Sequence, residues 1–114
     1  MILTINIKKD FPNSSYAVFL VDQEIELAPK TGVNIIIAIH GYGSHGKGGV
    51  IKQELHNFLR NMKNKNKIIN FVKGEEWSDV NPVVKEMSYK FPELILNENL
   101  NNFNNGVTVI WVRN

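Results

Sequence analysis

The sequence contains no cysteine, so it can form neither disulfide bonds nor thiolate-ligated metal sites. It has no apolar run long enough to span a membrane, and its N-terminus lacks the pattern of a signal peptide. Charges of the two signs nearly cancel, with a net charge of +2 over 114 residues, so total charge alone does not indicate a polyanionic ligand. These absences predict a cytoplasmic protein without a membrane partner. The length of 114 residues predicts a single domain over residues 1–114.

Strand and helix patterns alternate along the chain. β-branched or continuous apolar residues predict strands over 1–7, 35–39, 68–72 and 107–112, and a further short strand over 93–96. Helical spacing and capping residues predict helices over 14–29, 49–62 and 82–89, and the Asn-rich stretch 97–105 predicts an irregular loop. The order β-α-β-α-β-(α)-β predicts an α/β (α+β) two-layer sandwich, in which a small mixed sheet carries the two main helices on one face.

The second predicted helix has an apolar stripe and a solvated side. The stripe is expected to pack in the core and consists of Val50, Ile51, Leu55, Phe58, Leu59 and Met62. The side chains expected away from the stripe are Lys52, Gln53, Asn57 and Arg60. His56 is expected at the boundary or the surface, without a role as a ligand.

The stretch 33–52 reads as a buried strand, a glycine-rich loop and the start of a helix. Five glycines lie within nine residues, at positions 41, 43, 46, 48 and 49. Backbone N–H groups that no side chain shields, together with the positive end of a helix dipole, form a natural anion site. Lys47 and Lys52 add positive charge, and Ser44, His40 and His45 add hydrogen-bond donors. We therefore expect this loop to bind an anion rather than to serve only as a turn.

Three other readings of this loop are weaker. Gly41 to Lys47 spells GxxxxGK, as in a P-loop, but Gly48 stands where the magnesium-binding Ser or Thr belongs. The IHGYG segment is similar to the oxyanion loop of lipase-like hydrolases, but the chain has no G-x-S-x-G nucleophile motif. No metal site is predicted, because His40 and His45 lack a metal-binding spacing and the acidic residues 75, 76 and 79 read as solvated.

The segment His40-Gly41-Tyr42-Gly43-Ser44 resembles the HGxGS motif of the Smr (small MutS-related) domain family. Residues 71–75 and 105–109 also look like this family, and the resemblance covers nearly the whole chain. It implies a two-layer α/β fold like that of the C-terminal domain of translation initiation factor three, binding of DNA or RNA, and endonuclease (nicking) activity in some members. Many Smr domains begin with L-D-L-H-G, whereas this chain reads LTINIKKDFPN over residues 3–13.

The loop and the resemblance together predict a nucleic-acid site. The residues expected to bind the polymer are Gly41, Tyr42, Gly43, Ser44, Gly46, Gly48, Gly49, Lys52, Lys73 and Trp77. Tyr42 and Trp77 would stack on unpaired bases. If the protein cuts the strand, His40 is the expected base, His45 the acid and Lys47 the group that stabilises charge.

Two alternatives to a nicking endonuclease remain open at this stage. The missing N-terminal motif favours a nucleic-acid-binding or adaptor module without chemistry. The GxxxxGK spacing suggests a binder of nucleotides or other small phosphates. No cofactor is predicted, and a magnesium ion is expected only if the protein is a nuclease.

Overall fold

The computed structural model describes residues 1–8, 14–42 and 49–114. In this part of the chain a four-stranded sheet has the order β1-β2-β4-β3. Its strands are β1 (Ile2–Asn6), β2 (Ile35–Ile39), β3 (Ile68–Lys73) and β4 (Val107–Val112). β1 runs parallel to β2, and β4 is antiparallel to both of its neighbours. The predicted small mixed sheet is therefore confirmed.

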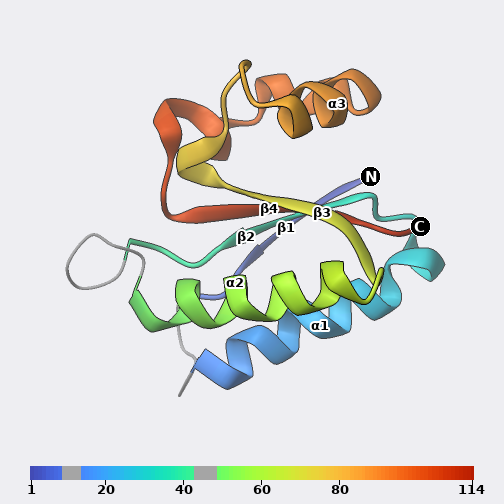
Figure 1. Ribbon diagram of the computed structural model, residues 1–114, viewed down its shortest axis with the longest axis vertical. Coiled ribbons are helices and arrows are strands. Elements are labelled where there is room, and N and C mark those ends of the chain that lie inside the picture. The colour runs from blue at the N-terminus through green and yellow to red at the C-terminus, as the bar shows by residue number, and fades with distance from the viewer. Residues whose placement is uncertain (9–13, 43–48) are drawn as a thin grey trace.

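Helices cover both faces of this sheet (Figure 1). The two main helices, α1 (Ser14–Thr31) and α2 (Gly49–Asn64), pack side by side on one face, as predicted. The other face is covered by α3 (Pro82–Lys90) and the 3-10 segments η1 (Gly74–Glu76), η2 (Pro92–Leu96) and η3 (Glu98–Phe103). Each face thus has its own apolar core, which explains why the central strands β2 and β4 are almost wholly buried.

Two local predictions differ from the structure. The first helix does not end at Pro29 but includes it and ends at Thr31, just before Gly32, which has a φ of +77°. Proline so near the end of a helix removes a single backbone hydrogen bond, and the remaining turn tolerates this loss. The predicted strand over 93–96 is wrong, because this segment is the 3-10 helix η2 and buries only Leu94 among its side chains.

The face that α2 turns toward the sheet also differs from the prediction. Its buried residues are Lys52, Leu55, His56, Leu59 and Met62, whereas Val50 is 63% exposed. The predictions for Val50, Lys52 and His56 are therefore wrong. Their spacing is still that of one helical face, but two of its five positions carry polar side chains. The side chains of Lys52 and His56 form hydrogen bonds with polar groups at one edge of the sheet.

That edge is formed by the carboxyl ends of β2 and β3 and the amino end of β4, which lies between them. β3 is thus not the direct neighbour of β2, but both strands end at the same edge. η1 follows β3 there and packs tightly against the segment before β4. A Cβ atom on Gly74 would lie 1.8 Å from the carbonyl oxygen of Asn104, so only glycine allows this approach. The close packing fixes the position of Glu75.

Candidate functional site

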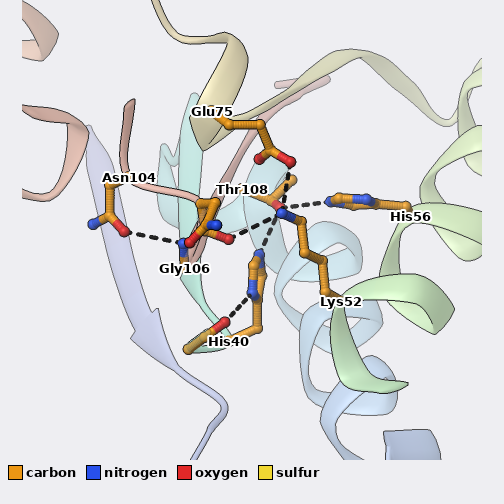
Figure 2. A network of polar contacts seen from close by, with 9 residues as sticks. His40, Lys52, His56, Glu75, Asn104, Gly106 and Thr108 are labelled. Atoms are coloured by element: carbon orange, nitrogen blue, oxygen red, sulfur yellow. Dashed lines mark hydrogen bonds and ion pairs between the residues drawn. The ribbon is translucent and has the colours of Figure 1, made fainter. Parts of the chain in front are cut away.

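Polar side chains from four segments meet at this edge of the sheet (Figure 2). His40 directly follows β2, Thr108 lies in β4, Lys52 and His56 project from α2, and Glu75 belongs to η1. Thr108 pairs in register with Ala38, whose side chain belongs to the core beneath α1 and α2. The Thr108 hydroxyl therefore points toward α2, and the rings of His40 and His56 both reach it, edge to face, with their centroids 6.0 Å apart.

Thr108 joins the two histidines through its hydroxyl group. Its Oγ1 lies 2.9 Å from Nε2 of His40 and 2.8 Å from Nε2 of His56. The other ring nitrogen of His40, Nδ1, lies 3.0 Å from the carbonyl oxygen of Gly41. All three side chains are buried, with relative exposures of 3% for His40, 5% for His56 and 0% for Thr108.

The chemistry of these groups fixes the direction of each hydrogen bond. A carbonyl oxygen only accepts, so Nδ1 of His40 must carry a proton and donate it to Gly41. The Nε2 atom of neutral His40 is then an acceptor, and the Thr108 hydroxyl donates to it. The hydroxyl oxygen in turn accepts the Nε2 proton of His56. The three hydrogen bonds thus form a chain in which His56 donates to Thr108, Thr108 donates to His40, and His40 donates to the carbonyl oxygen of Gly41.

Burial keeps both histidines neutral at physiological pH. It is the main cause that lowers the pKa of His40, and the charge of Lys52 adds to the effect. For His56, burial first and the neighbouring His40 second lower the pKa from 6.5 to about 4. The directional hydrogen-bond chain is therefore the arrangement present near pH 7.

Lys52 is held by two acceptors and does not offer a free charge. Its ammonium group donates to Oε2 of Glu75 at 2.7 Å and to the carbonyl oxygen of Asn105 at 3.0 Å. Burial, the largest single effect, acts to raise the pKa of Glu75, but the hydrogen bond and charge of Lys52, together with a backbone hydrogen bond and the charge of His56, lower that pKa overall. Lys52, which was predicted to hold a phosphate, thus links the start of α2 to η1 and to the segment before β4.

The ion pair allows a prediction about stability. Lys52 has a side-chain exposure of 9% and Glu75 one of 39%, so the pair is better shielded than an ordinary surface pair. We expect a double-mutant cycle of Lys52→Met and Glu75→Gln to give a coupling energy of about 1 kcal/mol, the upper end for partly exposed pairs. Urea denaturation of the two single variants and the double variant measures it. A coupling that is zero at low salt would contradict this account of the pair.

The described ends of the glycine loop form a second part of the site. Gly41 has a φ of +77°, a conformation that favours glycine, and the Lys8 side chain packs closely over it, since a Cβ atom on Gly41 would lie 3.2 Å from Cδ of Lys8. Tyr42 is 55% exposed and lines a shallow hollow with Lys8 and Gly106. The backbone N–H groups of His40 and Gly41 both donate to the carbonyl oxygen of Gly106. The loop therefore leaves β2 along a fixed path toward β4.

The predicted site residues are distributed unevenly over the structure. Six of them lie outside the described residues, namely Gly43, Ser44, His45, Gly46, Lys47 and Gly48. Lys73 pairs in register with Thr108, so it borders the polar cluster. Trp77 instead packs against the core on the α3 face and lines a hollow there with Asp79 and Tyr89. The structure thus separates Trp77 from the cluster around Thr108.

Three members of the cluster, His56, Thr108 and Glu75, were not predicted as site residues from the sequence. His56 lies on the buried face of α2 between Leu55 and Leu59, and a histidine at such a position is a signal for a buried polar partner. Thr108 is the only polar residue of a strand that is buried along its whole length. Within residues 1–8, 14–42 and 49–114, no three acidic or histidine side chains are grouped so that they could hold a metal ion. None of the described helices is long and apolar enough to cross a membrane.

Comparisons with known proteins identify the fold. No match was found among protein-family models or among curated proteins. Among solved structures, the chain is similar to the Smr domain of MutS2 from Thermus thermophilus, with a TM-score of 0.60 and 20% sequence identity. The similarity covers 98% of this chain and 99% of that domain. The chain therefore has the fold of an Smr domain, in agreement with the HGYGS motif at the end of β2.

Proposed function

We propose that this protein is a nucleic-acid-binding Smr-like domain that holds a backbone phosphate at the loop between β2 and α2. The observation that carries the proposal is the geometry of the loop's two described ends. Gly41 leaves β2 in a conformation that suits glycine, and the long helix α2 begins at Gly49. This arrangement on an Smr fold supports an anion site at the helix N-terminus, with Lys47 supplying a charge.

Exposed side chains beside the loop support a polymer rather than a single small anion as the ligand. Tyr42 presents a ring at the surface on which an unpaired base can stack. Lys8 is exposed next to Gly41 and adds a cation to the same hollow. A phosphate at the loop and a base on Tyr42 would belong to neighbouring parts of one strand. Contacts of this kind position a nucleic acid without reading its sequence.

A second candidate activity, nicking of the strand, is favoured by the hydrogen-bonded histidine pair next to the loop. Phosphodiester hydrolysis needs a base, an acid and stabilised negative charge, for which we propose His40, His45 and Lys47. A neutral imidazole is the form that a base requires, and the lowered pKa of His40 favours it. Both ring nitrogens of His40 form hydrogen bonds within the protein. His40 would therefore act as a base only after Nε2 gives up its hydrogen bond from Thr108 and accepts a proton from the attacking water instead.

The test uses supercoiled plasmid DNA and a structured RNA, each incubated with the protein at low salt, with and without magnesium. We expect the protein to retain both polymers in a gel, and Lys47→Ala to weaken this binding roughly threefold to tenfold, as the loss of one phosphate contact should. Lys67→Ala is the matched control, because Lys67 is an exposed lysine beyond the far end of α2.

The other outcomes discriminate between the candidates. Nicks that disappear in a folded His40→Ala variant would establish the endonuclease. Binding that free nucleotide abolishes would instead identify a nucleotide or small-phosphate binder. The absence of both binding and cleavage would refute the proposed function.

A further inference from the structure

Two hollows adjoin along the outer side of α2, where this helix borders the edge strand β3. One has a volume of about 280 Å³ and is lined by His56 and by polar residues of α2, and the other has about 370 Å³. Arg60 and Lys73 line both hollows, so the two adjoin, and we refer to them together as the groove between α2 and β3. The groove follows α2 from Gln53 to Asn64, a rise of about 16 Å at ~1.5 Å per residue.

Positive charge dominates this groove. Its walls carry the cations Arg60, Lys63 and Lys73 and the single carboxylate of Glu76. In the part of the chain that the structure describes, the one salt bridge is that of Lys52 with Glu75, so these three cations have no acidic partner there. The guanidinium group of Arg60 donates to the side-chain oxygen of Asn57, which holds it over the groove without neutralising it.

The groove suits an extended anion better than a compact one. Arg60, Lys63 and Lys73 line the larger hollow, and Arg60 and Lys73 also line the smaller one, so positive charge borders the groove along its length. Amide side chains, which can bond to phosphate and sugar, stand between the cations. The half-buried ring of Phe71 lines the same surface.

The groove is also joined to the polar cluster at the edge of the sheet. His56 lines its first hollow and bonds to Thr108. Burial is the main cause of the low pKa of His56, but the charge of Lys73 contributes, so this cation acts on the cluster as well. Because α2 begins where the glycine loop ends, a strand that leaves the loop along this helix enters the groove.

We propose that the groove between α2 and β3 binds the phosphate backbone of the same nucleic-acid strand that the glycine loop holds, with Arg60, Lys63 and Lys73 as its phosphate contacts. This proposal rests on the proposed function and extends it, because it adds a second contact surface and a path for the strand. The contacts are electrostatic, so each one adds to the salt dependence of binding.

The test measures fluorescence anisotropy of labelled 20-nucleotide DNA and RNA strands with the full chain, over a series of salt concentrations. The variant carries Arg60→Gln and Lys63→Gln, both at exposed positions of α2. The control carries Lys30→Gln and Lys85→Gln, which remove the same charge from the end of α1 and from α3. Thermal unfolding verifies that both variants are folded.

We expect the groove variant to bind roughly tenfold more weakly than the wild type near 0.1 M salt. Its slope of log affinity against log salt should fall by about 1.4, or ~0.7 for each lost contact with a single strand. The control should stay within about twofold of the wild type. Equal losses in both variants, or no loss in the groove variant, would overturn the groove while leaving the proposed function intact. A wild-type protein that binds neither strand would refute the proposed function and the groove together.

Discussion

Replacing Thr108 by valine should destabilise the protein by about 3 kcal/mol, one of the two largest effects that we expect. Valine has nearly the shape of threonine but removes the hydroxyl that bonds to both histidines. The Nε2 atoms of His40 and His56 would then be buried without partners, at a cost of roughly 1–3 kcal/mol each. Urea denaturation at pH 7 measures the change in the free energy of unfolding.

Two further variants make this result interpretable. Thr4→Val is the matched control, because Thr4 is an exposed residue of β1, and it should change stability by less than about 0.5 kcal/mol. Thr108→Ser keeps the hydroxyl and loses only a methyl group, so it should retain most of the stability. The account of the cluster is wrong if Thr108→Val is as stable as the wild type, since the hydroxyl would then not be needed.

The second large effect is a loss of stability as the pH falls from neutral to about 4. The pKa of His56 is about 4 in the folded protein and 6.5 in the unfolded chain, so the unfolded state binds the proton more readily. The stabilisation is therefore fully present above pH 6.5 and is lost as the pH falls through this interval. The difference in pKa corresponds to a maximum of about 3 kcal/mol. His40, whose pKa is also lowered, acts in the same direction.

A His56→Gln variant isolates this contribution. Glutamine does not titrate, yet its amide can still donate to the Thr108 hydroxyl. We expect urea midpoints measured between pH 7 and pH 4 to fall more steeply for the wild type than for the variant. Carboxylates titrate in both proteins, so the difference between their curves of urea midpoint against pH reports the titration of His56 alone. Parallel curves would mean that His56 does not carry the lowered pKa.

The sequence identified the parts of the fold that depend on local pattern. The apolar run 35–39 is buried on both faces because β2 is a central strand, and this is what an unbroken apolar run indicates. Asn81 and Pro82 begin α3 as expected, with the Asn81 side chain accepting from the N–H groups of Val83 and Val84. An apolar run and a helix cap can both be recognised from residues that are close together in the sequence.

The polar cluster was harder to predict, because its bonds join residues far apart in the sequence. His40 and Thr108 are separated by 68 positions, and nothing local shows that β4 inserts between β2 and β3. Lys52 looked solvated because a lysine at a core position is rare unless a partner such as Glu75 reaches it. Compared with the predicted helix, α2 is turned about its axis so that Lys52 and His56 face the sheet. Their partners Glu75 and Thr108 account for this orientation.

Mapping the contact surface by NMR tests the central claim most directly. The backbone N–H signals of the isotope-labelled protein would be followed during titration with short DNA and RNA strands. The account predicts that the largest shifts occur at Gly41, Tyr42 and Gly49 and continue along α2 to Arg60, with small shifts on α3. Shifts confined to α3 and the segments η2 and η3, or no shifts with either strand, would contradict a nucleic-acid site at the glycine loop.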